Sequence, residues 1–293
     1  MSLAVKAIQQ TTPRSIEFEI NSLKFSALEW GSPGQLPVLA LHGWLDNAAS
    51  FFRVAPLLDG VHLVAVDMAG HGRTDHRLGT SAYHCYDDIH DIFAIADYFD
   101  WDKFALMGHS RGAILGALAA GTFPERISHL ALIEGVLLEG IAAEKSPHQL
   151  AAAIKGLDYQ INKSLTVYSD INTAISAREN GMFPLSHEAA KAITERGLKT
   201  TDGGFSWSTD PRLLAPTPVK LTNEQFHSFI SNISAPCELI LGKQGLQKKY
   251  ADYLLALAKY PFIHSHLLEG GHHLHMEEDA QAVAKIIQAF FDK

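Results

Sequence analysis

The segment Phe104-Ala105-Leu106-Met107-Gly108-His109-Ser110-Arg111-Gly112-Ala113-Ile114 decides how this chain is interpreted. An apolar run leads through a G-x-S-x-G turn into residues with helical spacing, which predicts a strand, a tight turn and a helix. Both glycines have a steric reason, because a strained serine at the apex brings the residues on either side close together. The Ser110 hydroxyl should therefore project from the carboxyl end of a strand at a helix N-terminus. A tight turn around an unreactive serine is the alternative.

Strand and helix patterns alternate around this segment. Two alternating segments, 16–20 and 25–30, predict antiparallel strands. Near-continuous apolar runs at 37–41, 61–66, 104–107 and 130–133 predict strands covered on both faces of a parallel sheet, and strand signals return at 237–241 and 263–268. Helical spacing occurs at 49–58, 87–99, 111–122, 149–162, 187–197, 248–259 and 279–291. Such alternation predicts an α/β protein with a doubly wound sheet.

The strand pattern stops after Glu134 and returns only at residue 237. The intervening helical stretches are separated by Gly203-Gly204 and by the prolines at 211, 216 and 218. We therefore expect a core domain formed by residues 1–134 and 236–293, and an inserted helical cap formed by residues 135–235.

Composition narrows the functional class. The 293 residues are 47% hydrophobic and 19% charged, which is usual for a soluble globular protein. The net charge of -8 argues against nucleic-acid partners, which require a basic face. Residues 1–15 lack the apolar centre of a secretory signal, and no segment reaches the roughly 20 apolar residues of a membrane span. Cys85 and Cys237 are far apart, which favours reduced thiols. We therefore expect a cytoplasmic protein; its oligomeric state stays open.

Three further segments carry a family resemblance. Leu41-His42-Gly43-Trp44, the run from Asp67 to Thr74 (DMAGHGRT) and Phe123-Pro124-Glu125-Arg126-Ile127, together with Gly108 to Gly112, resemble the α/β-hydrolase superfamily. More narrowly, His42 to Asn47 with Gly108 to Gly112 is similar to serine hydrolase-like proteins. The resemblance extends from the first predicted strand to the end of the chain. It implies an α/β-hydrolase fold with a mostly parallel eight-stranded sheet, helices on both faces and a helical cap after strand 6.

A serine nucleophile needs a base, and histidine suits this role near neutral pH. The candidate among 16 histidines lies in Glu269-Gly270-Gly271-His272-His273-Leu274-His275, between the last predicted strand and helix. His272, directly after Gly271, fits the family resemblance best. Its neighbours His273 and His275 leave the position open by one residue, and a solvated cluster that binds stray divalent ions is the non-catalytic alternative.

The acid departs from the commonest family arrangement. Most relatives have an aspartate after the seventh strand, where this chain has Gln244-Gly245. Leu132-Ile133-Glu134-Gly135-Val136 resembles haloalkane dehalogenases and their relatives, which place the acid after the sixth strand. One helix and one strand separate Ser110 from Glu134, so both should emerge at the same edge of the sheet. A carboxylate there is costly unless paired, which favours His272 as its partner. Glu139, or a helix-capping role for Glu134, is the alternative.

The remaining candidates follow from the resemblance. The backbone N–H groups of Trp44 and Arg111 would form the oxyanion hole, and Trp44 is also a candidate wall of the acyl pocket. We expect a packing role for His109. Asp67, His71 and Arg73 should stabilise a turn. In the cap, Lys155, Arg178 and Trp207 are candidate substrate contacts, with surface or packing roles as the alternative.

These patterns predict a serine hydrolase. The chain would cleave an ester, thioester or similar small acyl substrate through an acyl-Ser110 intermediate, with His272 activating water in the second half. Phosphate-binding glycine loops and zinc-ligand spacings do not occur, so we expect no cofactor and no metal. A dehalogenase or epoxide hydrolase would have aspartate at position 110. Carbon–carbon bond hydrolysis or cofactor-free perhydrolysis on the same triad, and a non-catalytic ligand-binding or sensor protein, are the alternatives.

Overall fold

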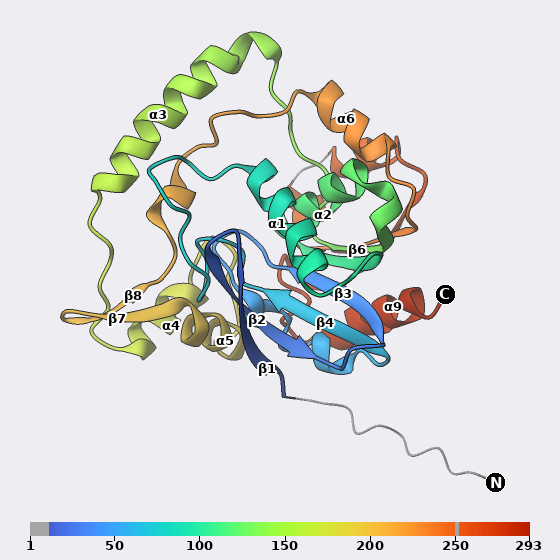
Figure 1. The fold of residues 1–293 in the computed structure, drawn as a ribbon, viewed down its shortest axis with the longest axis horizontal. Coiled ribbons are helices and arrows are strands. Elements are labelled where there is room, and N and C mark those ends of the chain that lie inside the picture. Colours follow the sequence, from blue (N-terminus) through green and yellow to red (C-terminus); the bar gives the residue numbers. More distant parts are fainter. Residues whose placement is uncertain (1–11, 250–251) are drawn as a thin grey trace.

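A central sheet of eight strands organises the molecule (Figure 1). The computed structural model describes residues 12–249 and 252–293. Strand order is β1-β2-β4-β3-β5-β6-β9-β10; β1 and β2 are antiparallel to their neighbours, and all other neighbours are parallel. The strand bounds are β1 Arg14–Ile20, β2 Leu23–Trp30, β3 Leu36–Leu41, β4 Val61–Val66, β5 Phe104–His109, β6 Ile127–Ile133, β9 Cys237–Gly242 and β10 Ile263–Leu268. The predicted mostly parallel eight-stranded sheet is confirmed.

Both faces of the sheet are covered, because alternate residues of each parallel strand enter different apolar clusters. In β3, Leu39 and Leu41 pack in the first cluster, whereas Val38 and Ala40 pack in the second. Helices on the first side are α1 (Cys85–Tyr98), α2 (Arg111–Thr122), α6 (Asn223–Ser231) and α8 (Tyr253–Leu257). On the second side lie α9 (Ala280–Phe291) and the 3-10 helices η1 (Ala48–Phe51) and η2 (Ala55–Leu57).

Two predicted helices take a different form. The segment 49–58 forms η1 and η2 instead of one α-helix, and Pro56 lies in the first turn of η2, where a missing backbone N–H is tolerated. The segment 248–259 overlaps α7 (Leu246–Lys249) and α8, while residues 250–251 lie outside the described residues.

Besides α6, the described part of the insertion between β6 and β9 contains three further α-helices and an unpredicted β-hairpin. The helices are α3 (Ser146–Asn162), α4 (Ile171–Glu179) and α5 (His187–Gly197), accompanied by the short 3-10 helices η4 (Ala143–Lys145) and η5 (Pro211–Leu214). The hairpin pairs β7 (Leu198–Thr201) with β8 (Gly204–Trp207). The glycine pair was expected to separate helices, but Gly203 has a φ of 85° and forms part of the hairpin turn. With only four residues each, these strands left too short a pattern for prediction.

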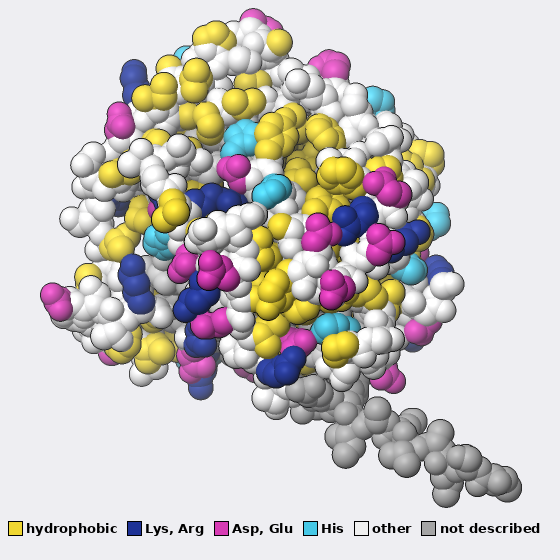
Figure 2. All heavy atoms as spheres, viewed as in Figure 1, with side chains coloured by type: hydrophobic (Ala, Val, Ile, Leu, Met, Phe, Trp, Pro, Cys, Tyr) yellow, Lys and Arg dark blue, Asp and Glu magenta, His cyan; other side chains and the backbone are white. Residues whose placement is uncertain are grey.

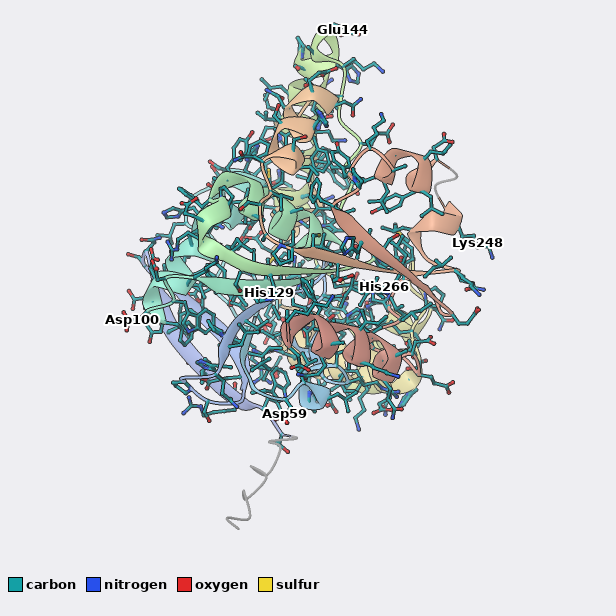
Figure 3. All side chains as sticks on the ribbon, turned by 90° about the vertical axis from the view of Figure 1, so that its right-hand side faces the viewer. Asp59, Asp100, His129, Glu144, Lys248 and His266 are labelled. Atoms are coloured by element: carbon teal, nitrogen blue, oxygen red, sulfur yellow. The ribbon has the colours of Figure 1, made fainter. Side chains whose placement is uncertain are left out.

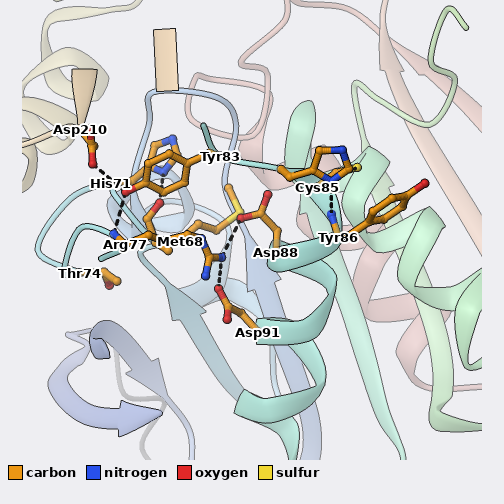
Figure 4. Close-up of polar contacts among 12 residues, drawn as sticks. Met68, His71, Thr74, Arg77, Tyr83, Cys85, Tyr86, Asp88, Asp91 and Asp210 are labelled. Atoms are coloured by element: carbon orange, nitrogen blue, oxygen red, sulfur yellow. Dashed lines mark hydrogen bonds and ion pairs between the residues drawn. The ribbon is translucent and has the colours of Figure 1, made fainter. Parts of the chain in front are cut away.

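Buried polar contacts connect the insertion to the core. Arg196 of α5 donates through Nε to Oδ1 of the fully buried Asp67, at 2.9 Å, after the end of β4. Asp210 accepts a hydrogen bond from the Tyr83 hydroxyl at 2.9 Å, and Figure 4 shows this pair beside Arg77. The proposed boundaries of the cap, 135–235, stay a prediction. Within them, α6 packs against the core helix α2.

Helix α3 forms an outer edge of the insertion (Figure 1). Its side chains Leu150, Ile154 and Tyr159 are exposed, and apolar atoms are visible over this part of the surface in Figure 2. Figure 3 places Glu144, just before α3, at the extreme tip of the molecule. Among the described residues, no helix is both long and apolar enough to cross a membrane.

Candidate active site

Ser110 lies at a sharp turn between β5 and α2. Its φ of 51° and ψ of -114° form a backbone conformation that is strained for a residue with a side chain. A Cβ at Gly108 would lie 2.5 Å from the carbonyl oxygen of Gly112, and one at Gly112 would lie 2.1 Å from the carbonyl oxygen of Leu41. The turn therefore accepts only glycine at both positions, as the sequence pattern predicts.

His272 lies between the Ser110 hydroxyl and a buried carboxylate. Its Nε2 is 3.0 Å from Ser110 Oγ, and its Nδ1 is 2.9 Å from Glu134 Oε2. A carboxylate only accepts hydrogen bonds, so Nδ1 carries the proton and Nε2 is left to accept from the hydroxyl. Burial lowers the pKa of His272, although the hydrogen bond to Glu134 opposes that shift. The imidazole is therefore neutral near pH 7 and able to take a proton.

Glu134 is fully buried and directly follows the end of β6. Its Oε1 accepts from the Gly242 N–H and its Oε2 from the Leu246 N–H, both at 2.7 Å. A Cβ at Gly245 would lie 2.2 Å from Glu134 Oε2, so this carboxyl group occupies the space that a side chain at position 245 would fill. The acid thus reaches the β9 loop from the neighbouring strand. The alternative acid, Glu139, is exposed.

The two strand ends bring these side chains together. The Ser110 N–H donates to the Ile133 carbonyl at 2.8 Å, and the Glu134 N–H donates to the Ile240 carbonyl at 2.9 Å. Both residues therefore continue the pairing of β5, β6 and β9 at one edge of the sheet. The three predicted residues, far apart in sequence, are adjacent in the structure.

The other histidines of this region are buried behind His272. His109 Nε2 lies 2.9 Å from the His272 carbonyl oxygen, and His275 Nε2 lies 2.8 Å from Ser50 Oγ. Burial holds the pKa of both His109 and His275 well below the ordinary value. Among the described hydrogen bonds, the Ser110 hydroxyl pairs with His272 and with neither of these two histidines. His109 packs against the rings of His272, His273 and His275, in line with the expected packing role.

The two expected oxyanion donors flank the serine. Arg111 is the first residue of α2, so its N–H has no acceptor within that helix. Its guanidinium pairs with Asp88 of α1, which Figure 4 shows next to Arg77. Trp44 belongs to the loop after β3 and lines the same pocket as Ser110. The Trp44 indole donates to the Leu213 carbonyl in η5, at 3.1 Å, which links this loop to the insertion.

Asp67 stabilises its turn as expected. Its Oδ1 accepts from the Ala48 N–H at 2.7 Å, and its Oδ2 accepts from the Arg73 N–H at 2.8 Å. His71 is buried in the same turn, with Nδ1 3.1 Å from the Ala69 carbonyl oxygen. These groups hold the loops beside the site and do not contact Ser110 through any described hydrogen bond.

A cavity of about 430 Å³ opens onto Ser110 and His272. Residues of the insertion form much of its wall, including the aromatic side chains Tyr168, Phe183 and Trp207. Of the three candidate substrate contacts in the cap, Arg178 and Trp207 line the cavity, whereas Lys155 is exposed and is not part of the lining. Sequence patterns missed Tyr168 and Phe183, because cap residues follow no motif that marks the cavity.

Asp46 is a further cavity residue to which the sequence patterns assigned no role. It lies in the quoted His42 to Asn47 segment and is buried, with its Oδ1 3.0 Å from Arg178 Nη2 and its Oδ2 3.3 Å from His273 Nε2. Burial alone would raise the pKa of this carboxyl, but His273 and Arg178 hold it well below the usual range. Asp46 is therefore ionised across the neutral pH range.

Comparisons with known proteins agree with this geometry. Residues 37–164 match the α/β-hydrolase fold family. The chain is 28% identical over 277 residues to a serine hydrolase-like protein of Danio rerio, a match that covers 89% of this chain and 83% of that protein. It is also similar to the crystal structure of a hypothetical protein of Pseudomonas aeruginosa, with 39% identity and a TM-score of 0.92 over 95% of this chain and 99% of that one. A thioesterase domain from the curacin biosynthetic pathway gives 26% identity and a TM-score of 0.83, covering 94% and 99%. The chain belongs to the α/β-hydrolase superfamily.

Proposed function

We propose that this protein is a serine hydrolase that cleaves an ester or related acyl substrate through an acyl-Ser110 intermediate. One observation carries the proposal: Ser110 Oγ, the His272 imidazole and the Glu134 carboxylate form a continuous hydrogen-bonded chain, with links of 3.0 and 2.9 Å. The α/β-hydrolase family match and the serine hydrolase-like relatives support hydrolysis as the reaction class.

Attack by Ser110 requires loss of its hydroxyl proton. His272 Nε2 accepts that proton as Oγ bonds to the acyl carbon, and Glu134 stabilises the imidazolium that results. The backbone N–H groups that hold both oxygens of Glu134 keep this carboxylate oriented. Negative charge on the substrate oxygen would be stabilised by the N–H groups of Trp44 and Arg111, the latter at the positive end of α2.

The same groups release the leaving group and hydrolyse the acyl-enzyme. His272 gives its proton to the leaving alcohol or thiol, which departs. It then takes a proton from a water molecule that attacks the acyl carbon, and returns that proton to Ser110 Oγ as the acid product leaves. Every proton passes through Nε2, so no cofactor is required for this scheme.

The cavity favours a substrate with an apolar acyl group. Aromatic rings of Trp44, Tyr168, Phe183 and Trp207 line it close to Ser110. Apolar walls with few polar groups are typical of sites that bind small organic molecules. We propose that the insertion, residues 135–235, acts as the cap over this cavity and that thioesters are included among the substrates, which the similarity to a thioesterase domain supports.

Labelling with a fluorophosphonate separates catalysis from simple ligand binding. The wild-type chain should gain one phosphonyl group at Ser110, because an activated hydroxyl attacks phosphorus, and the Ser110→Ala variant should gain none. A matched control is Ser164→Ala, since Ser164 lines the same cavity but has no described base beside it. An unlabelled wild type, or equal labelling of Ser110→Ala, would favour the non-catalytic ligand-binding alternative.

A further inference from the structure

Three candidate metal-ligand atoms converge behind the catalytic groups. They belong to Asp46, His109 and His273, and all lie within 4.8 Å of one another. All three residues are buried; His109 is 0% exposed, and the other two are at most 5% exposed. Buried carboxylate and imidazole groups normally have partners, so an incompletely paired cluster of this kind calls for a physical explanation.

His109 presents an unused lone pair to this cluster. Its Nε2 lies 2.9 Å from the His272 carbonyl oxygen, which only accepts, so Nε2 carries the ring proton and Nδ1 is bare. Nδ1 is buried and has no hydrogen-bond partner among the residues that the structure describes. An imidazole that donates one N–H to a backbone carbonyl and aims its other nitrogen at a cluster has the arrangement of a metal ligand with its supporting contact.

Asp46 directs one carboxylate oxygen at each of two partners. Oδ1 faces Arg178 at 3.0 Å, whereas Oδ2 faces His273 Nε2 at 3.3 Å. A Cβ at Gly43 would lie 2.9 Å from His109 Nδ1 and 3.2 Å from Asp46 Oδ2. Glycine at this position therefore leaves open the space that borders both ligand atoms.

The cluster lies at the wall of the substrate cavity. Gly43, Asp46, His109 and His273 all contribute to the cavity wall. An ion that enters this cavity would therefore meet the wall that these residues form. An entry path, two imidazoles and one carboxylate are together what a divalent transition-metal site requires.

We propose that Asp46 Oδ2, His109 Nδ1 and His273 Nε2 form an inhibitory binding site for a divalent transition-metal ion of the zinc class, with solvent as a fourth ligand. Two histidines and a carboxylate suit zinc better than magnesium or calcium, which prefer oxygen ligands. The sequence did not suggest this site, because Asp46 is too distant along the chain to be grouped with the histidines.

Inhibition follows from the position of the ion, and this part of the inference rests on the proposed function. His109 precedes Ser110 and His273 follows His272; the ring centroid of His272 is 4.9 Å from that of His109 and 5.1 Å from that of His273. An ion held by these neighbours would place its solvent ligand in the cavity that Ser110 and His272 also line, where it would exclude the substrate. The ion is therefore a reversible inhibitor and not a participant in the reaction.

Arg178 should weaken binding of the ion, so its removal tests the site by an expected gain of affinity. Its Nη2 is 3.4 Å from His273 Nε2 as well as 3.0 Å from Asp46 Oδ1. A guanidinium so close repels a divalent cation, while it also competes for the Asp46 carboxylate. Replacing Arg178 by glutamine should therefore tighten metal binding, whereas a loss of fold would weaken it.

Isothermal titration of the full chain with ZnCl2 tests the site without any need for activity. The wild type should bind one Zn²⁺, Asp46→Asn and His273→Asn should each weaken that binding by about 100-fold, and Arg178→Gln should strengthen it by about tenfold. A matched control is His266→Asn, on the outer strand β10 (Figure 3), where a histidine pairs with Glu238 at 2.7 Å away from the cavity. This variant should bind like the wild type.

The inference is overturned if the wild type binds no Zn²⁺ stoichiometrically, or if Asp46→Asn and His273→Asn bind it as the wild type does. An Arg178→Gln variant with unchanged or weaker affinity also contradicts it. In a parallel arm, Zn²⁺ should slow fluorophosphonate labelling of the wild type, and a chelator should restore the rate. Labelling unaffected by bound Zn²⁺ rejects the inhibitory role. A chain that binds Zn²⁺ at this site but is never labelled instead refutes the proposed hydrolase function.

Discussion

The carboxylate of the triad can be moved from β6 to the loop after β9. Glu134→Gly removes the present acid, and glycine readily keeps the positive φ of 51° at this position. Gly245→Asp then introduces a carboxylate in the loop after β9, where the family resemblance places the acid of most relatives. Because the Cβ of residue 245 would point at the space that the Glu134 carboxyl fills, the second change restores negative charge beside His272.

The structure sets the size of each effect. Glu134→Gly removes the 2.9 Å hydrogen bond that fixes the His272 tautomer and offsets its charge, so kcat/KM should fall on the order of 10⁴-fold, which is about 5 kcal/mol of transition-state stabilisation. Gly245→Asp alone should also be harmful, because its Cβ would lie 2.2 to 2.4 Å from three Glu134 carboxyl atoms. In the double variant the clash is gone, and the Gly242 and Leu246 N–H groups can hold the new carboxylate. We expect it to recover at least about 100-fold over Glu134→Gly.

Hydrolysis of a short p-nitrophenyl ester, followed by absorbance, measures all four proteins, and circular dichroism verifies that each variant is folded. Glu139→Gln is a matched control, since Glu139 is exposed a few residues beyond Glu134 and should leave the rate unchanged. The reasoning is refuted if folded Glu134→Gly keeps wild-type activity, or if Glu139→Gln loses more activity than Glu134→Gly.

Three further results are expected. Because burial lowers the pKa of His272 and the Glu134 hydrogen bond raises it, the acidic limb of kcat/KM should have its midpoint below 6.5 and should move lower still in Glu134→Gln; a pH–rate profile with a midpoint above 6.5 would contradict this. Buried neutral histidines such as His275 have folded pKa values far below 6.5, so the unfolded chain binds more protons there and stability should fall by more than about 1 kcal/mol from about pH 7.5 to about pH 5, as urea unfolding can measure. Arg196→Leu leaves the buried Asp67 charge unpaired and should cost about 3–5 kcal/mol of unfolding free energy; a change below about 1 kcal/mol in urea unfolding would show that the pair is unimportant.

Local patterns predicted the core of the molecule well, for physical reasons. The apolar pattern predicts β4 at 61–66, and the apolar spacing together with Pro124 predicts α2 at 111–122, because these elements are buried and their apolar residues repeat regularly. The need for glycine at 108 and 112 also follows from the sequence motif; the group that crowds Gly108 lies within the turn, whereas the Leu41 carbonyl that crowds Gly112 belongs to a distant strand.

Other features depend on contacts between distant segments. The β7–β8 hairpin was not predicted, because its strands are short and partly polar. Glu134 could be chosen as the acid because position 245 lacks a carboxylate, but only the structure shows its carboxyl filling the space at Gly245. Asp46 approaches His109 and His273 because two separate loops meet the end of strand β5. Hydrophobic periodicity does not predict contacts between such distant segments.

The central claim is that Ser110 carries the acyl group during turnover. Mass spectrometry of chain that is acid-quenched while it hydrolyses a p-nitrophenyl ester tests this directly. The account predicts a single acyl adduct, mapped by peptide fragmentation to Ser110, and its absence from Ser110→Ala. Steady hydrolysis by the wild type with the adduct on another residue, or undiminished hydrolysis by Ser110→Ala, would contradict the account.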